Sequence, residues 1–360
     1  MATSSIEWTE MTWNPTLGCS EQSPGCTNCY AVKMAWRLMH IEKQKENYRD
    51  LVKKLPNGRL VWTGKLNLIQ ERLIEPFLQK KPTMYFVNSM SDLFHPEVPF
   101  EFIHKVFIVM ALTPQHTYQI LTKQPERAAE YFKQYPYSGL ADRQDDIDVE
   151  TYEYFNYIHE VTEHREYGIS LGGLLPHIKA AGWFWDTNYT EWGKESHLIL
   201  ENEEPLANVW LGVSVESAKY EHRIETLRGI PAAIRFVSFE PLIGPILPNL
   251  DNIHWAIVGG ESGNGKGIRP MSPVFVKDIR DICKMSGTAF FFKQWGNYLP
   301  LDVGAFGDIA ADGSNRFFHW EESESSKYTR QFGQLFYNLG KHKSGALLDG
   351  VEHKQFPKKK

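Results

Sequence analysis

Three of the four cysteines of this chain, Cys19, Cys26 and Cys29, lie close together in a C-x6-C-x2-C pattern. With only four cysteines in 360 residues, such clustering indicates metal binding or redox chemistry rather than a disulfide framework. Three thiolates on one glycine-containing loop can hold three irons of a [4Fe–4S] cluster and leave the fourth iron open. The alternative is a structural zinc site, for which His40 or a residue of the tail would supply the fourth ligand.

The fourth cysteine has a different setting. Cys283 lies on the apolar face of a helix predicted between Ser272 and Gly287. Ser272 is placed to cap this helix and Gly287 to end it. Because a free cysteine on such a face behaves as a small hydrophobic side chain, we expect Cys283 to pack in the core.

The reactive residues need a scaffold, and the chain alternates strand-like segments with helical stretches. This alternation predicts an α/β fold with a parallel sheet, a complete or partial TIM-like barrel. Several segments are continuous apolar runs, which are typical of strands buried on both faces. The seven predicted strands span residues 12–17, 84–89, 117–122, 209–215, 234–239, 255–260 and 289–293.

Polar residues follow every predicted strand, and in parallel barrels the working residues lie at these carboxyl ends. The cysteine loop follows the first strand. The later strands supply, in order, Asn88, Ser89 and Asp92; Lys123; Ser214 and Glu216; Glu240; Gly259, Gly260 and Glu261; and Lys293. We expect the charged members, Lys123, Glu216, Glu240, Glu261 and Lys293, to be catalytic, and the two glycines to let a ligand approach the backbone. For Lys123 and Glu216 the structural alternative is a mutual ion pair in the barrel mouth.

The pattern divides the chain into four parts. Residues 1–133 form the first half of the barrel with the cysteine loop, and residues 206–300 form the second half. Residues 134–205, acidic and rich in tyrosine and tryptophan, are too long for a plain loop and predict a helical and aromatic cap. Residues 301–360 form a C-terminal extension packing on the barrel. A charged segment, residues 41–55, predicts a further helical insertion.

Composition limits where the protein acts. A net charge of −5 gives no globally basic surface, so any nucleic-acid contact depends on a local patch. The longest apolar run, residues 107–112, is too short to cross a bilayer, and the N-terminus lacks the pattern of a signal peptide. We therefore expect a cytoplasmic protein that does not contact a membrane.

Several motifs resemble a known enzyme superfamily. Trp13-Asn14-Pro15, the three cysteines followed by Tyr30, and Leu121-Thr122-Lys123 resemble the spore photoproduct lyase branch of the radical S-adenosylmethionine superfamily. Nearly the whole chain outside the long insertion is similar to a phage-encoded family of unassigned function, through residues 86–95, 210–216, 236–241, 259–263, 291–296 and 347–350. The chain departs from the superfamily's commonest C-x3-C-x2-C spacing, and Asn28 holds the position of its usual aromatic residue.

This resemblance implies a [4Fe–4S] cluster and S-adenosylmethionine as cofactors, an external electron donor, and hydrogen abstraction from a substrate. It implies that Asn88, Ser89 and Asp92 hold the methionine amino group, and that Ser214 and Glu216 approach its carboxylate or ribose. The substrate expected from family likeness is a nucleic-acid base or nucleotide, and a partner protein is compatible with the pattern.

Two other functions remain open. Glu216, Glu240 and Glu261 at strand ends are the equipment of a TIM-barrel glycoside hydrolase, which works with a pair of carboxylates. The second open function is a zinc- or cluster-stabilised module that binds nucleic acid or protein without catalysis. Trp183, Trp185 and Trp192 of the insertion could stack on bases, or could build the core of the cap.

Overall fold

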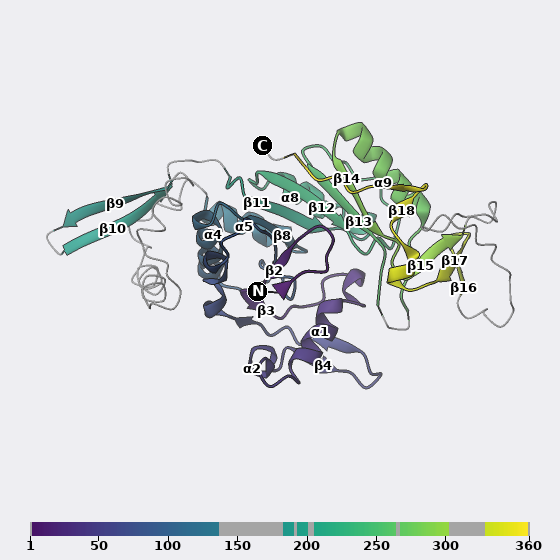
Figure 1. The fold of residues 1–360 in the computed structure, drawn as a ribbon, viewed down its shortest axis with the longest axis horizontal. Helices are drawn as coiled ribbons and strands as arrows, with labels where there is room; N and C mark the ends of the chain where they lie inside the picture. Colours follow the sequence, from purple (N-terminus) through teal and green to yellow (C-terminus); the bar gives the residue numbers. More distant parts are fainter. Residues whose placement is uncertain are drawn as a thin grey trace.

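The computed structural model describes residues 2–136, 183–190, 193–200, 205–263, 267–301 and 328–358. Its main feature is an eight-stranded sheet in the order β1-β2-β7-β8-β11-β12-β13-β14 (Figure 1). The edge strand β1 (Ala2–Thr3) is antiparallel to β2 (Met11–Trp13), and the strands from β2 onward are parallel. The others are β7 (Met84–Val87), β8 (Thr117–Thr122), β11 (Val209–Ser214), β12 (Ile234–Phe239), β13 (Trp255–Gly259) and β14 (Ala289–Gln294).

This curved sheet confirms a partial parallel barrel. Its edge strands, β1 and β14, do not pair with each other in the described residues, so the sheet stays open. Strands β8 and β12 begin and end where the sequence predicts them, and β7, β11, β13 and β14 differ by one or two residues at one end. The continuous apolar runs are buried on both faces, as in β11 and β13, where every residue is buried.

The first predicted strand is wrong as a continuous element. Strand β2 ends at Trp13, and β3 (Thr16–Leu17) pairs antiparallel with β6 (Asn67–Leu68) outside the main sheet. The break falls at Pro15, which lacks an N–H group and cannot continue a central ladder. The chain therefore turns at the end of β2, and a bridge between Gly18 and Ser91 ties it back to the end of β7.

Four helices cover one face of the sheet: α4 (Phe100–Leu112), α5 (Pro125–Gln134), α8 (His222–Arg228) and α9 (Pro273–Ser286). With the strands they enclose the largest core cluster. Helix α9 confirms the clearest sequence prediction, since Cys283 is buried with the apolar face and Gly287 ends the helix with a left-handed φ of 73°. Ser272 occupies the N-cap position, but its side chain makes no capping hydrogen bond.

The opposite face carries a second, aromatic cluster that includes Trp8, Trp210, Trp255 and Phe291. Both chain ends contribute to it. Gln119 donates a hydrogen bond to the Trp8 carbonyl at 3.1 Å, and Trp255 donates to the Gln355 carbonyl at 2.8 Å. The space enclosed by the strands is therefore packed at this level, and the polar side chains gather beyond it, at the carboxyl ends.

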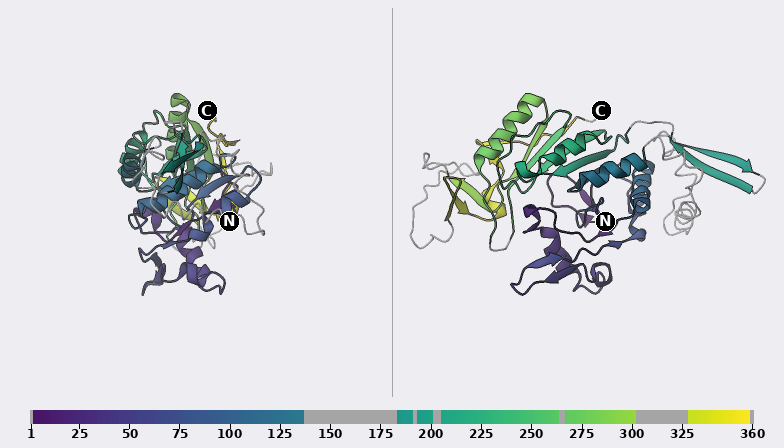
Figure 2. Two further views of the ribbon diagram at one scale, coloured as in Figure 1. Left: turned by 90° about the vertical axis from the view of Figure 1, so that its left-hand side faces the viewer. Right: turned by 180° about the vertical axis from the view of Figure 1, so that it is seen from behind.

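Residues between the cysteine loop and β7 form a small N-terminal subdomain. It contains α1 (Tyr30–Leu38), α2 (Lys45–Tyr48), β4 (Val52–Lys54), β5 (Leu60–Trp62), the turn η2 (Gln70–Arg72) and α3 (Glu75–Leu78). The helical prediction for residues 41–55 is wrong in its second half, because Val52 begins an antiparallel β4–β5 hairpin and is buried with Trp62. Figures 1 and 2 place this subdomain, in purple, on the side of the sheet opposite to α8 and α9.

Much of the predicted cap lies outside the described residues. The part that is described pairs β9 (Trp183–Thr190) with β10 (Gly193–Leu200) as an antiparallel hairpin. A helical cap is therefore not confirmed and stays a prediction. Trp192 lies outside the described residues. Stacking of bases on Trp183, Trp185 and Trp192 therefore stays a prediction.

The C-terminal part contains a three-stranded sheet and two short additions. Strands β15 (Tyr298–Leu301), β16 (Tyr328–Gln331) and β17 (Gln334–Asn338) pair antiparallel, followed by α10 (Lys341–Ser344) and the β18 (Leu347–Leu348)–β19 (Val351–Glu352) hairpin. Lys354 then forms an antiparallel bridge with Phe291 of β14. Across the described residues, no helix is both long and apolar enough to cross a membrane.

Candidate cofactor site at the strand ends

The cysteine loop leaves β3, makes the short turn η1 (Pro24–Cys26) and enters α1. All three of its thiols are partly buried. Cys29 occupies the N-cap position of α1, where burial raises its pKa and a smaller effect of the Ala31 and Val32 backbone N–H groups opposes that rise. A helix N-terminus favours negative charge, so this position suits a thiolate.

The three thiols lie close enough to influence one another. Burial raises the pKa of Cys19 well above its ordinary value, and the charges of Asp92, Cys29 and Cys26 raise it further. Burial also raises the pKa of Cys29, with a smaller contribution from Cys26. In the described residues, no three or more His, Cys, Asp or Glu side chains are grouped to hold one metal ion.

A buried ion pair holds the loop from the far side. Lys123, at the end of β8, forms an ion pair with Glu216, whose side chain is 0% exposed beyond β11. The Lys123 ammonium also donates to the Ser23 hydroxyl at 2.9 Å and to the Cys26 sulfur at 3.6 Å. Arg223 is the second cation on this carboxylate, at 3.2 Å, and it also donates to the Ser214 carbonyl at 2.8 Å.

The turn of the loop fits directly over this carboxylate. Ser23 donates to Glu216, and a Cβ added at Gly25 would lie 2.7 Å from the Cγ of Glu216. On its other side, Arg269 donates to the Pro24 carbonyl at 2.9 Å. The absence of a side chain at Gly25 is therefore what allows the loop to sit on the end of β11.

The end of β7 holds Asn88 in a left-handed conformation, with φ of 59°. Its side-chain oxygen accepts a hydrogen bond from the Thr16 amide at 3.4 Å, while its Nδ2 is buried without a partner in the described residues. Ser89 donates to Asn14 Oδ1 at 3.2 Å. Of Asn88, Ser89 and Asp92, Asn88 is therefore the one whose buried donor has no partner in the described residues.

Asp92 ties the end of β7 to the end of β8. It accepts hydrogen bonds from the Thr122 hydroxyl at 2.7 Å and from the Lys123 and Phe94 amides at 2.9 and 3.0 Å. Burial nevertheless raises the pKa of Asp92 above its ordinary value, against these hydrogen bonds. Its oxygens are occupied by the protein, so the contacts explain Asp92 as a strand-end anchor.

A second ion pair lies at the ends of β12 and β14. Lys293 Nζ is 2.9 Å from Glu240 Oε1, and the side chains are 17% and 15% exposed. Gly259, on the strand between them, faces the Glu240 carboxylate, and Gly260 faces the Trp295 carbonyl. These protein contacts account for both glycines, so their predicted approach to a ligand stays a prediction.

Glu261 takes no part in that pair. Its carboxylate binds Arg269, which donates from Nε at 3.0 Å and from its backbone amide at 2.8 Å. Because the same arginine reaches the Pro24 carbonyl, Glu261 acts on the cysteine loop through Arg269. Each of the three predicted glutamates is thus paired with a basic side chain.

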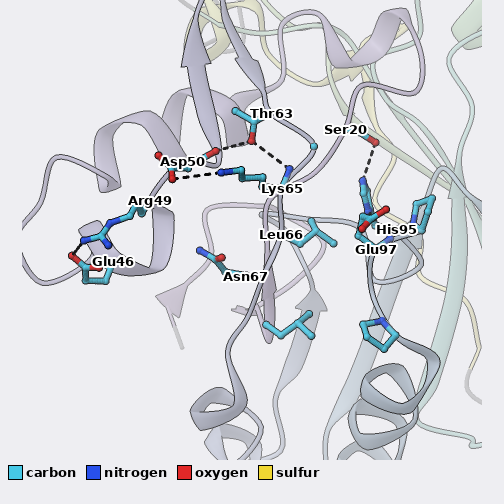
Figure 3. A pocket seen from close by; sticks show the side chains of 14 residues that line it. Ser20, Glu46, Arg49, Asp50, Thr63, Lys65, Leu66, Asn67, His95 and Glu97 are labelled. Carbon is cyan, nitrogen blue, oxygen red and sulfur yellow. Dashed lines mark hydrogen bonds and ion pairs between the residues drawn. The ribbon is translucent and has the colours of Figure 1, made fainter.

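A cavity of about 810 Å³ opens beside the loop, between the N-terminal subdomain and the segment that follows β7 (Figure 3). Ser20, next to Cys19, and His95 meet in its wall, where His95 Nε2 and the Ser20 hydroxyl are 3.0 Å apart. The Glu97 amide donates to His95 Nδ1, so Nε2 carries the hydrogen. Burial lowers the pKa of His95, which keeps this ring neutral.

Sequence reasoning brought together most of the residues at this mouth but missed Ser23, Gly25, Arg223 and Arg269. Arg223 carried a usable signal, because it lies seven positions after Glu216 and opens the helix that returns from β11. Gly25 follows Pro24 inside the cysteine spacing, a turn signal that could have marked a tight contact. No sequence signal marked Arg269, because its role depends on contact with a loop that is distant in sequence.

A profile of a family described as "Protein of unknown function (DUF5131)" matches residues 3–357, nearly the whole chain. A search of curated proteins gave no significant match, and neither did a search of solved structures. A function for this chain therefore has to be argued from the residues of the site.

Proposed function

This chain belongs to the DUF5131 family of proteins of unknown function, and we propose that it is a radical S-adenosylmethionine enzyme. The observation that carries the proposal is the position of three mutually influencing thiols, on one loop, at the carboxyl ends of a partial parallel barrel. Parallel barrels place their chemistry at this end. The superfamily resemblance of the cysteine loop and of residues 121–123 agrees with this position.

The donor set fits an iron–sulfur cluster. A structural zinc ion needs four ligands drawn around one point, whereas the cysteines of a [4Fe–4S] cluster bind different irons. Cys19, Cys26 and Cys29 would hold three irons, and the fourth would remain for the amino acid part of S-adenosylmethionine. When bound, these cofactors supply a carbon radical that abstracts hydrogen from the substrate.

The remaining residues of the mouth would bind, orient and shield. Lys123 places a positive charge 3.6 Å from the Cys26 sulfur, which stabilises negative charge on that ligand. Asn88 Nδ2 offers a buried donor that has no partner in the described residues, suited to a carboxylate or ribose oxygen of the cofactor. The N-terminal subdomain packs Cys19 and Cys29 against its own core and excludes water from that side.

The paired glutamates weigh against glycoside hydrolysis. A glycosidase needs one carboxyl group in surroundings that favour its protonated form. Glu216, Glu240 and Glu261 each contact a basic side chain instead, so none of the three lies in such surroundings. The hydrolase alternative also gives the three-cysteine loop no role.

Anaerobic reconstitution tests the proposal. We expect about four irons and four sulfides per chain by the stoichiometry of the cluster, and an electron paramagnetic resonance spectrum that changes when S-adenosylmethionine is added. Cys19→Ala, Cys26→Ala and Cys29→Ala should each lose the spectrum, because each removes an iron ligand. One zinc and no iron per chain would overturn the proposal in favour of a metal-stabilised binding module.

Cys283→Ala is the matched control. Cys283 is 1% exposed in the main core, and burial raises its pKa to about 12, so it remains a neutral thiol. The variant should keep full iron content and lose roughly 1 kcal/mol of stability from packing. Equal loss of iron in all four variants would show that folding, rather than ligation, governs cluster loading.

A further inference from the structure

One charged side chain from outside the cysteine loop contacts a cysteine sulfur. Lys123, just after β8, places its Nζ 3.6 Å from the Cys26 Sγ, and its side chain is 18% exposed. The Ser23 hydroxyl is the other polar group at this sulfur, at 3.8 Å. Because Ser23 donates its hydrogen to Glu216 and accepts one from Lys123, it has none left for Cys26. Among the described side chains, Lys123 is therefore the donor to this sulfur.

Lys123 is one end of a row of three charges. Glu216 lies between Lys123 and Arg223, and the side chains of Glu216 and Arg223 are 0% and 4% exposed. No other carboxylate contacts either cation within the described residues. Two cations with one carboxylate leave a net positive charge. Lys123 is therefore the member of the row next to Cys26, and Glu216 is the member that compensates the two cations.

A charge beside a ligand sulfur acts on the reduction of an iron–sulfur cluster. The reduction potential of such a cluster depends on the net charge, the hydrogen bonds to its sulfurs and its exposure to solvent. Reduction adds one electron from an external donor, and no bond forms or breaks. A nearby positive charge stabilises the more negative, reduced form and raises the potential, whereas a negative charge lowers it. Because Glu216 and Arg223 are buried, salt screens their effect only weakly.

We propose that Lys123 and Glu216 set the reduction potential of the cluster held by the cysteine loop, and that they act with opposite signs. Lys123 raises the potential through its contact with the Cys26 sulfur. Glu216 lowers it by compensating Lys123 and Arg223. The inference rests on the cluster of the proposed function, but not on the reaction of that cluster with S-adenosylmethionine.

The test is a redox titration of the reconstituted full chain, followed by the electron paramagnetic resonance signal of the reduced cluster. Lys123→Met removes a positive charge and should shift the potential to more negative values. Lys123→Arg keeps the charge and should stay close to wild type. Glu216→Gln removes the negative charge and should shift the potential to more positive values. The double variant Lys123→Met/Glu216→Gln should lie between the two single variants.

Lys277→Met is the matched control. Lys277 is 43% exposed, pairs with Asp349 and makes no contact with the cysteine loop in the part of the chain that the structure describes. Its removal should leave the potential unchanged. Because Glu216→Gln leaves two cations without their counter-charge, iron per chain and thermal unfolding are recorded for every variant. If Glu216→Gln does not load iron, Lys123→Met against Lys123→Arg decides, since Glu216 keeps Arg223 in both.

Opposite shifts support the inference, because a disturbed loop would not reverse the effect with the sign of the charge removed. Shifts in the same direction for Lys123→Met and Glu216→Gln would overturn it. So would an unchanged potential in Lys123→Met at full iron content. Wild type without iron would overturn it together with the proposed function. A cluster that shows the opposite shifts but no response to S-adenosylmethionine would keep this inference and remove the radical function.

Discussion

Two lysine–glutamate pairs at the ends of neighbouring strands use the same chemistry in different surroundings. Glu216 is 0% exposed and contacts Lys123, Arg223 and Ser23, so its two oxygens are surrounded by protein donors. Glu240 keeps 15% of its side chain exposed and, within the described part of the chain, contacts one cation, Lys293. The first pair carries the cysteine loop on its carboxylate, whereas the second faces the mouth with nothing from the loop bonded to it among the described contacts.

Burial and the number of protein partners separate the two pairs. Removing one partner from a buried ion pair leaves an uncompensated charge and strongly destabilises the fold. A partly exposed pair keeps contact with water, so losing one partner costs less. Residue type alone does not distinguish the two pairs; the number of partners and the exposed fraction do.

The largest effect is expected at Glu216. Glu216→Ala leaves Lys123 and the buried Arg223 without their counter-charge, and removing one partner of a buried pair costs roughly 3–5 kcal/mol. Chemical denaturation measures this loss. The same change at Glu240 should cost clearly less, because water reaches that pair.

Similar losses of stability for Glu216→Ala and Glu240→Ala would contradict this difference between the two pairs. They would mean that burial and the number of partners do not separate the two pairs. A loss at Glu240 larger than at Glu216 would reverse the assignment.

The sequence predicted the barrel well because its strands are long apolar runs. Residues 117–122 and 234–239 are buried along most of their length, and no competing period exists in them. The first predicted strand was wrong because an apolar pattern takes no account of Pro15, where the hydrogen-bonded ladder of the sheet ends. The helix predicted for residues 41–55 was wrong because the charges of this segment suggest a solvated helix. In the structure, Val52 instead pairs with Trp62, outside the segment, in a β-hairpin.

The site was predictable at the level of which strand ends carry charge. The sequence offered the ion pair of Lys123 and Glu216 as a structural alternative, and the structure confirms the pair. Which cation meets Glu240 or Glu261 was not predictable, because Lys293 and Arg269 reach them through the curvature of the sheet and the path of a loop. Local patterns contain no information on such distant contacts.

A smaller effect is expected at Gly25, where the loop meets the anchor. In Gly25→Ala the added methyl group would overlap the Glu216 side chain, and relief of such overlap typically costs about 1–3 kcal/mol. The loop should shift, and iron per chain after reconstitution should fall. Gly229→Ala is the control, since among the described residues its Cβ would meet only the Thr226 carbonyl at 3.5 Å, an ordinary contact. Full iron loading in Gly25→Ala would show that Glu216 does not position the loop.

The smallest effect is expected at Asp349, which forms an exposed cluster with two basic side chains. Asp349 contacts Lys277 and Arg280 at 2.7 Å each, and hydrogen bonding to these cations lowers its pKa. Its side chain is 46% exposed, so Asp349→Asn should cost less than about 1 kcal/mol. A carboxyl group with a lowered pKa stabilises the fold above its ordinary pKa and loses that effect as pH falls and it protonates. Denaturation at pH 7 and at pH 3 should therefore show a small difference from wild type that shrinks in acid.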